Sequence, residues 1–475
     1  MVTVGTTRQR VGRWVLALSV LATACSSSDD DGTAVSPGTP ESEPVSAMVE
    51  IEPTDDAKAI IEAAEPGTMF EFAAGVHAVD SIEPSDGQQF TGSPGAVLTG
   101  AVVLEGFEAA GDVWVIAGQT SERPPGGTCA SGRSRCDRPE DLFLDGEPLL
   151  HVDGTEAVVP GTWHFDYEAD EIHLGSDPGG AVVELSVARH AFTGEAGDVV
   201  IRGLIVEKFA TPAQAGAIHA RDGQAWLIED CVTRLNHGAG VYAGPGTTVQ
   251  GCELVDNGQH GVLGRGADVL VEDNLIARNN YAGFSSGWSA GGAKFVETTG
   301  LVVRGNRVEA NVGPGLWTDV GAIDTTYEGN EIVDNTGAGI LHEISYDALV
   351  SDNDITGNGS PELGWVWGAG IQLANVSNVE VRSNRLEGNV NGIIATKQDR
   401  GAEFEPCCLT IERNVLVDTG RSGVSQDVGD QGVYDAEIVF RGNEYSGDVV
   451  WGWMDEERSW AEWQDFGNDV DGSYR

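Results

Sequence analysis

One unit recurs along the chain from about residue 200 onward, and this repeat limits what the chain can fold into. Each unit has a short stretch of alternating β-branched and polar residues, as in LVVRGN, then a second short strand, a second Asn and a Gly followed by an aliphatic residue. The first Asn is at Asn274, Asn306, Asn330, Asn353, Asn384, Asn414 and Asn443, with Cys231 and Cys252 in the same place in the first two units. The second Asn is at Asn236, Asn257, Asn279, Asn311, Asn335, Asn358 and Asn389. The base period is about 22–24 residues, and some units carry insertions.

A period of this length with short strands predicts a parallel β-helix, because three strands and three turns fill about 22 residues. No unit contains a helical pattern long enough for a leucine-rich or ankyrin repeat. Successive coils would lie about 4.8 Å apart. The repeated Asn residues would then form an internal ladder in which each amide bonds to the next.

Units such as VRGNRVEANVGPGLW and YEGNEIVDNTGAGIL resemble those of the right-handed parallel β-helix proteins of the pectate-lyase-like superfamily. The stretch DDAKAIIEAAEPGTMFEFAAGVHAV resembles the start of that family, a short capping helix followed by the first strand, and the resemblance covers roughly residues 48–450. It implies an all-β chain folded as a right-handed parallel β-helix. This scaffold carries lyases, hydrolases, epimerases and inert surface proteins, so the resemblance leaves the activity open.

The remaining segments differ in character from the coils. Residues 113–190 contain hairpin patterns with turn signals such as Asp145-Gly146, and the last segment is rich in Trp, as expected of a cap. We expect a lipoprotein-type signal peptide over 1–24, a flexible tether over 25–47, an N-terminal cap and first coils over 48–112, a β-hairpin insertion over 113–190, β-helix coils over 191–447 and a C-terminal cap over 448–475.

The N-terminus is typical of an export signal, with three Arg residues before the short apolar run WVLALSVLATA. The run ends at Cys25 and is followed by a polar, Ser- and Asp-rich stretch, which resembles a bacterial lipoprotein signal. That resemblance implies lipidation of Cys25 and a place at the cell surface or in the cell envelope, with the lipid as the membrane contact. An ordinary secretory signal is the alternative. In an exported chain, Cys129 and Cys136 in one polar loop predict a disulfide.

The charge of the chain excludes one class of partner. There are 75 Asp and Glu against 27 Lys and Arg, a net charge of −48. Nucleic-acid binding needs clustered cations, so we do not expect it. We expect a monomer that binds a polysaccharide.

Rows of side chains on one outer face predict the site, since polymer-processing β-helices place their sites there. Counted from the Gly of each unit, one row is Ala243, Gly264, Ser286, Thr318, His342, Leu373, Ala395 and Gln426. The next row is Gly244, Arg265, Gly287, Asp319, Glu343, Ala374, Thr396 and Asp427. Small residues dominate the early coils, and charged and hydrogen-bonding residues gather from Asp319 onward.

Asp319 and Glu343 share one position on neighbouring coils, so their carboxylates would be about 5 Å apart. Such a pair predicts either the two acids of a retaining glycosidase or oxygen ligands for Ca²⁺. A solvated acidic face is the simplest alternative. His342, whose unperturbed pKa suits neutral pH, is a further candidate acid or base.

Lysines near this row indicate a different chemistry. Lys294 is expected beside Asp319, and Lys397 is a second candidate base with Arg400 near it. β-Elimination of a uronate needs a base and a group that neutralises the carboxylate. Expected substrate-binding residues are Trp288, Trp317, Gln372, Arg400, Gln426 and Asp427. We therefore expect a polysaccharide lyase first, a glycoside hydrolase as one alternative and a non-catalytic glycan-binding or adhesion protein as another.

Overall fold

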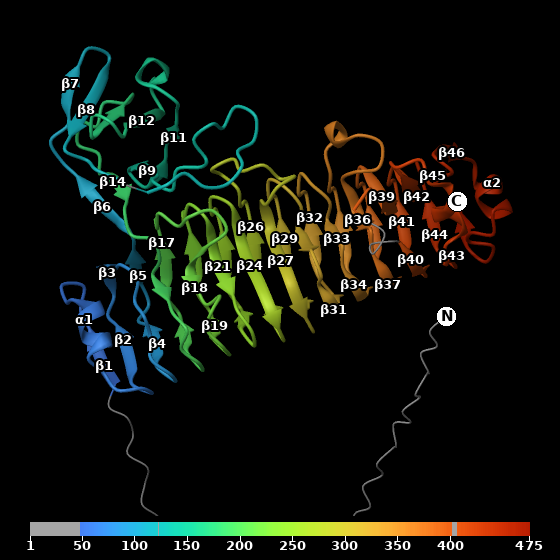
Figure 1. The fold of residues 1–475 in the computed structure, drawn as a ribbon, viewed down its shortest axis with the longest axis horizontal. Helices are drawn as coiled ribbons and strands as arrows, with labels where there is room; N and C mark the ends of the chain where they lie inside the picture. The colour runs from blue at the N-terminus through green and yellow to red at the C-terminus, as the bar shows by residue number, and fades with distance from the viewer. Residues whose placement is uncertain (1–47, 122, 401–405) are drawn as a thin grey trace, which may run out of the picture. The chain divides into compact units, whose positions relative to one another are not determined.

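The structure is a computed structural model that describes residues 48–121, 123–400 and 406–475. It confirms the right-handed parallel β-helix, with its strands stacked coil upon coil (Figure 1). The expected signal peptide, the tether and Cys25 lie outside the described residues. Within the described ranges, the structure contains no helix with the length and apolar character needed to span a membrane.

Each coil contributes one strand to each of three walls, and the first two walls are joined into one sheet of 25 strands. Wall 1 consists of β15 (Phe192–Thr193), β18 (Gly216–His219), β21 (Ala239–Ala243), β24 (His260–Ala267), β27 (Gly291–Thr299), β30 (Leu316–Asp319), β33 (Ile340–Glu343), β36 (Ala369–Ala374), β39 (Asn391–Lys397), β42 (Arg421–Gln426) and β45 (Val450–Trp453). Wall 2 consists of β1 (Met48–Ile51), β2 (Met69–Phe72), β4 (Gln89–Gly92), β16 (Val200–Arg202), β19 (Leu227–Glu229), β22 (Thr248–Gln250), β25 (Leu270–Glu272), β28 (Val302–Arg304), β31 (Ile323–Glu328), β34 (Tyr346–Ser351), β37 (Ser377–Arg382), β40 (Cys407–Glu412) and β43 (Ile438–Arg441).

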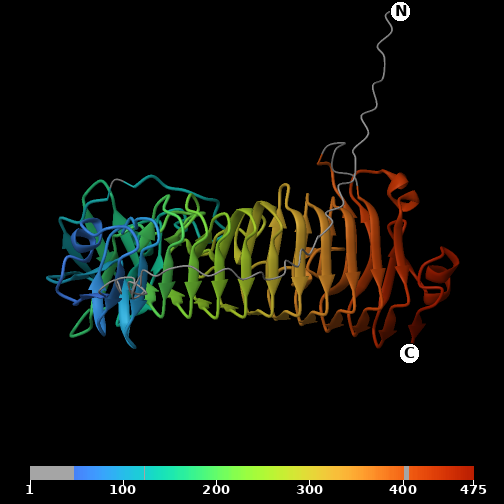
Figure 2. The same ribbon diagram turned by 90° about the horizontal axis from the view of Figure 1, so that it is seen from below.

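Wall 3 is a separate parallel sheet of 13 strands. It consists of β3 (Gly75–Ala78), β5 (Ala96–Thr99), β17 (Ile205–Glu207), β20 (Val232–Arg234), β23 (Glu253–Val255), β26 (Leu275–Ala277), β29 (Arg307–Glu309), β32 (Glu331–Val333), β35 (Asp354–Thr356), β38 (Arg385–Glu387), β41 (Val415–Val417), β44 (Glu444–Ser446) and β47 (Ser473–Tyr474). The regular succession of coils is clearest when the molecule is seen from below (Figure 2).

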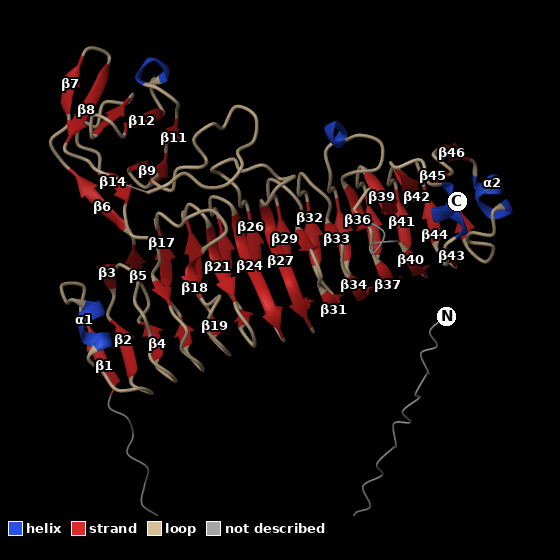
Figure 3. Ribbon diagram, viewed as in Figure 1, coloured by secondary structure: helices blue, strands red, loops and turns tan. Residues whose placement is uncertain are grey.

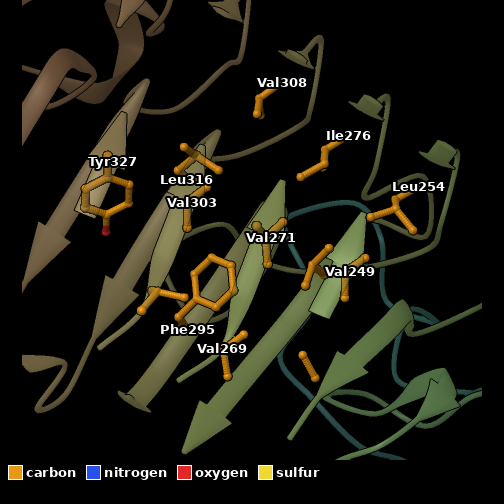
Figure 4. Close-up of a cluster of buried hydrophobic side chains, with 14 of the residues drawn as sticks. Val249, Leu254, Val269, Val271, Ile276, Phe295, Val303, Val308, Leu316 and Tyr327 are labelled. Carbon is orange, nitrogen blue, oxygen red and sulfur yellow. The ribbon is translucent and has the colours of Figure 1, made fainter. Parts of the chain in front are cut away.

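The space between the walls is filled by in-register rows of buried aliphatic and aromatic side chains (Figure 4). Val249, Val271 and Val303 follow one another on successive strands of wall 2, and Tyr327 continues their row. Leu254, Ile276 and Val308 do the same on wall 3. All seven side chains are fully buried, so burial of apolar surface is the main force that holds the coils together.

Two Asn ladders run through the interior, as the repeat predicted. In the first, each side-chain amide from Asn274 to Asn414 donates to the carboxamide oxygen of the next coil's Asn at 2.9–3.0 Å. The last member, Asn443, donates to the carboxylate of Asp469 at 2.8 Å. The second ladder runs from Asn236 to Asn389. These bonds satisfy polar groups that the core would otherwise leave unpaired.

Both ends of the described β-helix are closed by short helices (Figure 3). Helix α1 (Ala57–Glu62) begins where the Asp56 side chain accepts from the Ala59 amide, and it buries Ala57 and Ile61 against the core. At the other end, β46 (Glu456–Arg458) turns back on β45, and α2 (Trp460–Asp465) starts with a capping box between Ser459 and Glu462.

The hairpin insertion lies beside the first coils (Figure 1). It consists of β6 (Ala101–Leu104), β7 (Glu108–Ala110), β8 (Val113–Ala117), β9 (Leu142–Leu144), β10 (Glu147–Pro148), β11 (Leu150–His151), the 3₁₀ turn η1 (Thr155–Ala157), β12 (Thr162–Asp166), β13 (Glu171–Leu174) and β14 (Val183–Ser186). It begins before residue 113, because β6 already pairs with β14. Two further 3₁₀ turns, η2 (Pro361–Leu363) and η3 (Gln431–Asp435), lie in loops between later coils.

Candidate functional site

The candidate site lies on the outer face of wall 1, where β30 and β33 are neighbouring parallel strands. Trp317 pairs in register with Leu341, and Thr318 pairs with His342. Successive side chains of a strand point to opposite faces. Trp317 and Leu341 belong to a small cluster outside the core, so the residues two places on, Asp319 and Glu343, also point outward from adjacent coils.

Lys294, on β27, joins this outer face from the preceding coil. Its ammonium lies 3.0 Å from the Asp319 carboxylate and 3.4 Å from the centre of the Trp317 ring. It also donates to the Trp288 carbonyl oxygen at 3.1 Å. Burial lowers the pKa of Lys294, and the charge of Asp319 opposes that shift. The expectation that Lys294 lies beside the acidic row is confirmed.

Glu343 has a different environment from Asp319. Its carboxylate accepts from the Arg400 guanidinium at 2.6 Å, and its side chain is only 7% exposed. Burial raises the pKa of Glu343, and the negative charge of Asp319 raises it further. Arg400 and Lys294 oppose this change without reversing it. The carboxyl of Glu343 therefore holds its proton at higher pH than an ordinary glutamate does.

A pocket of about 350 Å³ opens beside Glu343. Two tryptophans, Trp317 and Trp367, supply aromatic faces, and Gln398 and Arg400 supply hydrogen-bond donors. The other lining residues are Ser286, Gly287, Pro314, Gly337, Ala338, Leu341, Leu363 and Gly368. An apolar pocket with a few convergent polar groups is the usual form of a small-ligand site, and aromatic faces suit sugar rings.

His342 does not belong to this site, which corrects the expectation of a catalytic role. Its strand position points inward, in line with Phe295, Thr318 and Leu373. The ring is fully buried, its Nδ1 lies 2.5 Å from the Thr318 hydroxyl, and burial lowers its pKa to about 3. His342 is thus a neutral residue of the interior.

Asp319 and Lys294 lie on the same outer face as Glu343 but do not line the pocket, and four other predicted residues lie farther away. Lys397 is two coils beyond Glu343 and pairs with Asp430. Gln426 pairs in register with Lys397 and bonds to Asp455, and Asp427 follows it on an exposed turn. Gln372 is fully buried and donates to Thr396 at 2.8 Å.

The rows counted from the sequence were therefore misaligned at two coils. Phe295, rather than Ser286, stacks on Gly264, and Val424, rather than Gln426, stacks on Ala395. Ser286 nevertheless lines the pocket, from the loop that precedes β27.

Trp288 packs against Phe284 in that same loop, with ring centres 6.3 Å apart, and contributes its carbonyl oxygen to Lys294. Its ring belongs to a cluster that includes the Cys129–Cys136 disulfide, which the structure contains. Trp288 therefore supports the site without lining its pocket.

The acidic pair does not fit a calcium site. Each carboxylate already pairs with a cationic side chain, and Ca²⁺ requires six to eight oxygen ligands. Across the part of the chain that the structure describes, no cluster of three or more His, Cys, Asp or Glu is suited to a metal ion.

Several lining residues were not predicted, among them Leu341, Leu363 and Gln398. Leu341 could have been found from strand alternation, since it is two places before Glu343. Leu363 and Gln398 lie in insertions between coils, where the repeat carries no positional signal. Arg400, although it follows β39, reaches back over two coils to Glu343.

Comparisons with known proteins agree with the fold. Residues 216–368 match the family model described as right handed beta helix region. The structure resembles that of XylC in complex with xylose, with a TM-score of 0.68 and 14% identity, over 90% of this chain and 86% of that chain. At this identity the likeness concerns the fold alone. The search of curated sequences found no match.

Weaker structural likenesses extend to proteins of different kinds. The mannuronan C-5 epimerase AlgE4 A-module of Azotobacter vinelandii has a TM-score of 0.47 and 13% identity, over 88% of this chain and 91% of that chain. The surface adhesin PfbA of Streptococcus pneumoniae has a TM-score of 0.44 and 12% identity, over 84% and 88%.

Proposed function

We propose that the protein is a glycoside hydrolase that binds a glycan in the pocket beside Glu343 and cleaves it with Asp319 and Glu343. The observation that carries the proposal is the position of these two residues. They occupy equivalent outward positions on adjacent strands, and the charge of Asp319 acts on the pKa of Glu343. Neighbouring strands are about 4.8 Å apart, close to the carboxyl separation of about 5–5.5 Å in retaining glycosidases.

The environments of the two acids assign their roles. A raised pKa suits Glu343 to be the general acid. Asp319 is held in place by the Lys294 ammonium, and 16% of its side chain is exposed, so it is the candidate nucleophile. Two acids with distinct surroundings are the arrangement that a double-displacement reaction requires.

The reaction then takes two steps. In the first, protonated Glu343 gives its proton to the glycosidic oxygen while the Asp319 carboxylate attacks the anomeric carbon. The glycosidic bond breaks, the alcohol leaves, and a glycosyl ester forms on Asp319. In the second step the Glu343 carboxylate takes a proton from water, whose oxygen attacks the same carbon. The sugar and the Asp319 carboxylate are released, with retention at the anomeric carbon.

β-Elimination is the second candidate, and one observation favours it. Burial lowers the pKa of Lys294, as a lysine base would require, and the Arg400 side chain is 42% exposed and could neutralise a uronate. The contacts of Lys294 argue against a role as the base. Its ammonium is engaged by Asp319, by the Trp288 carbonyl and by the Trp317 ring.

Product analysis on neutral and uronic-acid glycans separates the candidates. New reducing ends without ultraviolet absorbance from unsaturated sugars support hydrolysis, and both signals together support elimination. Asp319→Asn and Glu343→Gln should each reduce hydrolysis by about 10²–10⁴-fold or more. If neither signal appears with any of a broad panel of glycans, a glycan-binding or adhesion protein is favoured.

Arg278→Gln is the matched control for those two variants. Arg278 pairs with Asp256 on wall 3, away from the pocket, so its loss should leave the rate unchanged. If Asp319→Asn and Glu343→Gln keep the wild-type rate, the assignment of the site is wrong.

A further inference from the structure

A second cavity lies where the insertion meets the coils. Its volume is about 200 Å³. The insertion contributes Arg133, Arg135, Cys136, Asp141, Pro148, Leu149, Leu150 and His151, and the coils contribute His237, Tyr281 and Ala282. None of these residues takes part in the proposed hydrolysis.

Two guanidinium groups give this cavity a cationic wall, in a chain with a net charge of −48. Among the described residues no carboxylate forms an ion pair with Arg133. The Arg133 side chain packs against Gly283, where an added Cβ would lie 2.4 Å from Arg133 Cγ. Arg135 pairs at 3.2 Å with Asp153, whose side chain is 65% exposed and so remains largely in solvent.

His151 adds a neutral donor. Its Nε2 accepts from the Phe165 backbone N–H at 3.3 Å, so the ring proton is on Nδ1. Nδ1 is buried and has no hydrogen-bond partner within the described ranges. Stacking on Trp163, with ring centres 4.1 Å apart, fixes the ring. A buried donor without a partner indicates a missing acceptor.

The acid of the cavity, Asp141, is already neutralised. Tyr281 donates its hydroxyl proton to Asp141 Oδ2 at 2.7 Å, and His237 Nδ1 lies 3.1 Å from the same oxygen. His237 Nε2 donates to the Cys136 carbonyl at 2.9 Å. Burial lowers the pKa of His237, but the Asp141 charge and these bonds raise it overall, which favours the imidazolium. Asp141 therefore does not cancel the charge of the arginines.

We propose that this cavity binds a carboxylate-bearing sugar, with the carboxylate on Arg133 and Arg135 and a ring oxygen or hydroxyl on His151 Nδ1. Guanidinium groups match carboxylates with two parallel hydrogen bonds. Pro148, Leu149 and Leu150 provide apolar surface for one face of the ring. The cavity is smaller than the roughly 300–1,000 Å³ of sites for drug-sized ligands, so it admits a single ring.

One loop connects this cavity with the hydrolytic pocket. Residues 281–282 line the cavity, and residues 286–287 line the pocket. The loop is held to the insertion, because Ala130 N–H donates to Gly283 at 2.9 Å and Ser285 N–H donates to Thr128 at 2.8 Å. The bound sugar thus lies next to the segment that shapes the pocket.

Isothermal titration of the full chain with glucuronate tests the proposal directly. Glucuronate should bind, glucose should bind at least 10-fold more weakly, and Arg133→Ala should weaken glucuronate at least 10-fold. Arg133 is exposed, so this variant should keep its fold, which circular dichroism checks. Arg133→Lys should restore part of the affinity, since it restores charge without the paired hydrogen bonds.

Arg400→Ala is the matched control, since it removes an arginine from the hydrolytic pocket. Glucuronate affinity should be unchanged in Arg400→Ala and in Glu343→Gln, so the result does not depend on the proposed hydrolysis. The proposal is overturned by unchanged affinity in Arg133→Ala, by loss of affinity in Arg400→Ala, by equal binding of glucose or inorganic phosphate, or by no binding of glucuronate.

Discussion

The Lys294 ammonium lies 3.0 Å from the Asp319 carboxylate, and both side chains are largely buried, at 6% and 16% exposed. The pair links β27 to β30 across the coil boundary. It gives Lys294 a positioning role in the proposed hydrolysis and a catalytic role in the alternative elimination. The two reactions therefore predict different results for the same substitution.

Lys294→Met should lower the free energy of unfolding by about 2–3 kcal/mol, because it leaves Asp319 partly buried without its partner. Hydrolysis should fall about 10–100-fold through misplacement of Asp319. Urea unfolding and steady-state kinetics measure the two effects. Lys208→Met is the control, since Lys208 forms a similarly buried pair with Glu184 away from the pocket, and it should affect stability alone. Complete loss of activity with Lys294→Met would favour elimination.

The pH profile should respond to Arg400. Hydrolysis needs protonated Glu343, so kcat/KM should fall as pH rises through the raised pKa of that residue, above 4.5. Arg400 favours the charged form of Glu343. In the Arg400→Gln variant, the fall in kcat/KM should therefore occur at higher pH. If the fall in kcat/KM stays at the same pH in this variant, or moves to lower pH, Glu343 does not control it.

The same shift has a consequence for stability. Because the folded-state pKa of Glu343 is raised, its contribution to stability is full below 4.5 and is lost as pH rises through the folded value. Glu343→Gln should remove this dependence, which thermal unfolding at several pH values can measure.

The Asn ladder should be sensitive to single substitutions. Asn330 accepts from the Asn306 amide and donates to Asn353 and to the Val303 carbonyl. Asn330→Ala leaves several buried groups unpaired and should cost about 3–5 kcal/mol of unfolding free energy in a urea titration. Gln250→Ala, which removes an amide bonded to Glu229 on the outer surface, should cost less than about 1 kcal/mol. Equal costs would contradict an energetic role for the ladder.

We also propose that export leads to lipidation of Cys25, within GRWVLALSVLATAC. In that case Cys25→Ser should move the protein from the membrane fraction to the soluble exported fraction, and Ser26→Ala should not. Identical fractionation of the Cys25→Ser variant and the wild type would point to an ordinary secretory signal.

The repeat made the fold predictable because every coil imposes the same requirements. Each Asn recurs at one place, so stacking brings Asn306 and Asn330 together whatever the intervening loop. The face of the wall to which each side chain points was harder to predict. His342 follows an outward residue, Leu341, and strand alternation turns it inward, a rule that the row count overlooked.

The insertions between coils limited how much of the site could be predicted from the sequence. The loop before β27 shifted the row count, which placed Ser286 where Phe295 stacks on Gly264. The segment that carries Arg400 brings a side chain back over two coils. Whether a loop side chain reaches back over earlier coils depends on the conformation of the loop, which the repeat does not predict. The second cavity escaped prediction for the same reason, because Arg133 and Tyr281 meet only through the docking of the insertion.

The first ladder also has a direction. Every carboxamide gives one N–H to the following coil and the other to a backbone carbonyl of an earlier coil, so the last Asn needs an acceptor oxygen beyond it. Asp469 supplies it, as it accepts from the Asn443 backbone and side chain, from Tyr445 and from Trp463. The Asn ladder therefore ends at a side chain that accepts hydrogen bonds and donates none. Evolution or design could add coils before Asp469, but a coil placed after it would meet a carboxylate with no hydrogen to share.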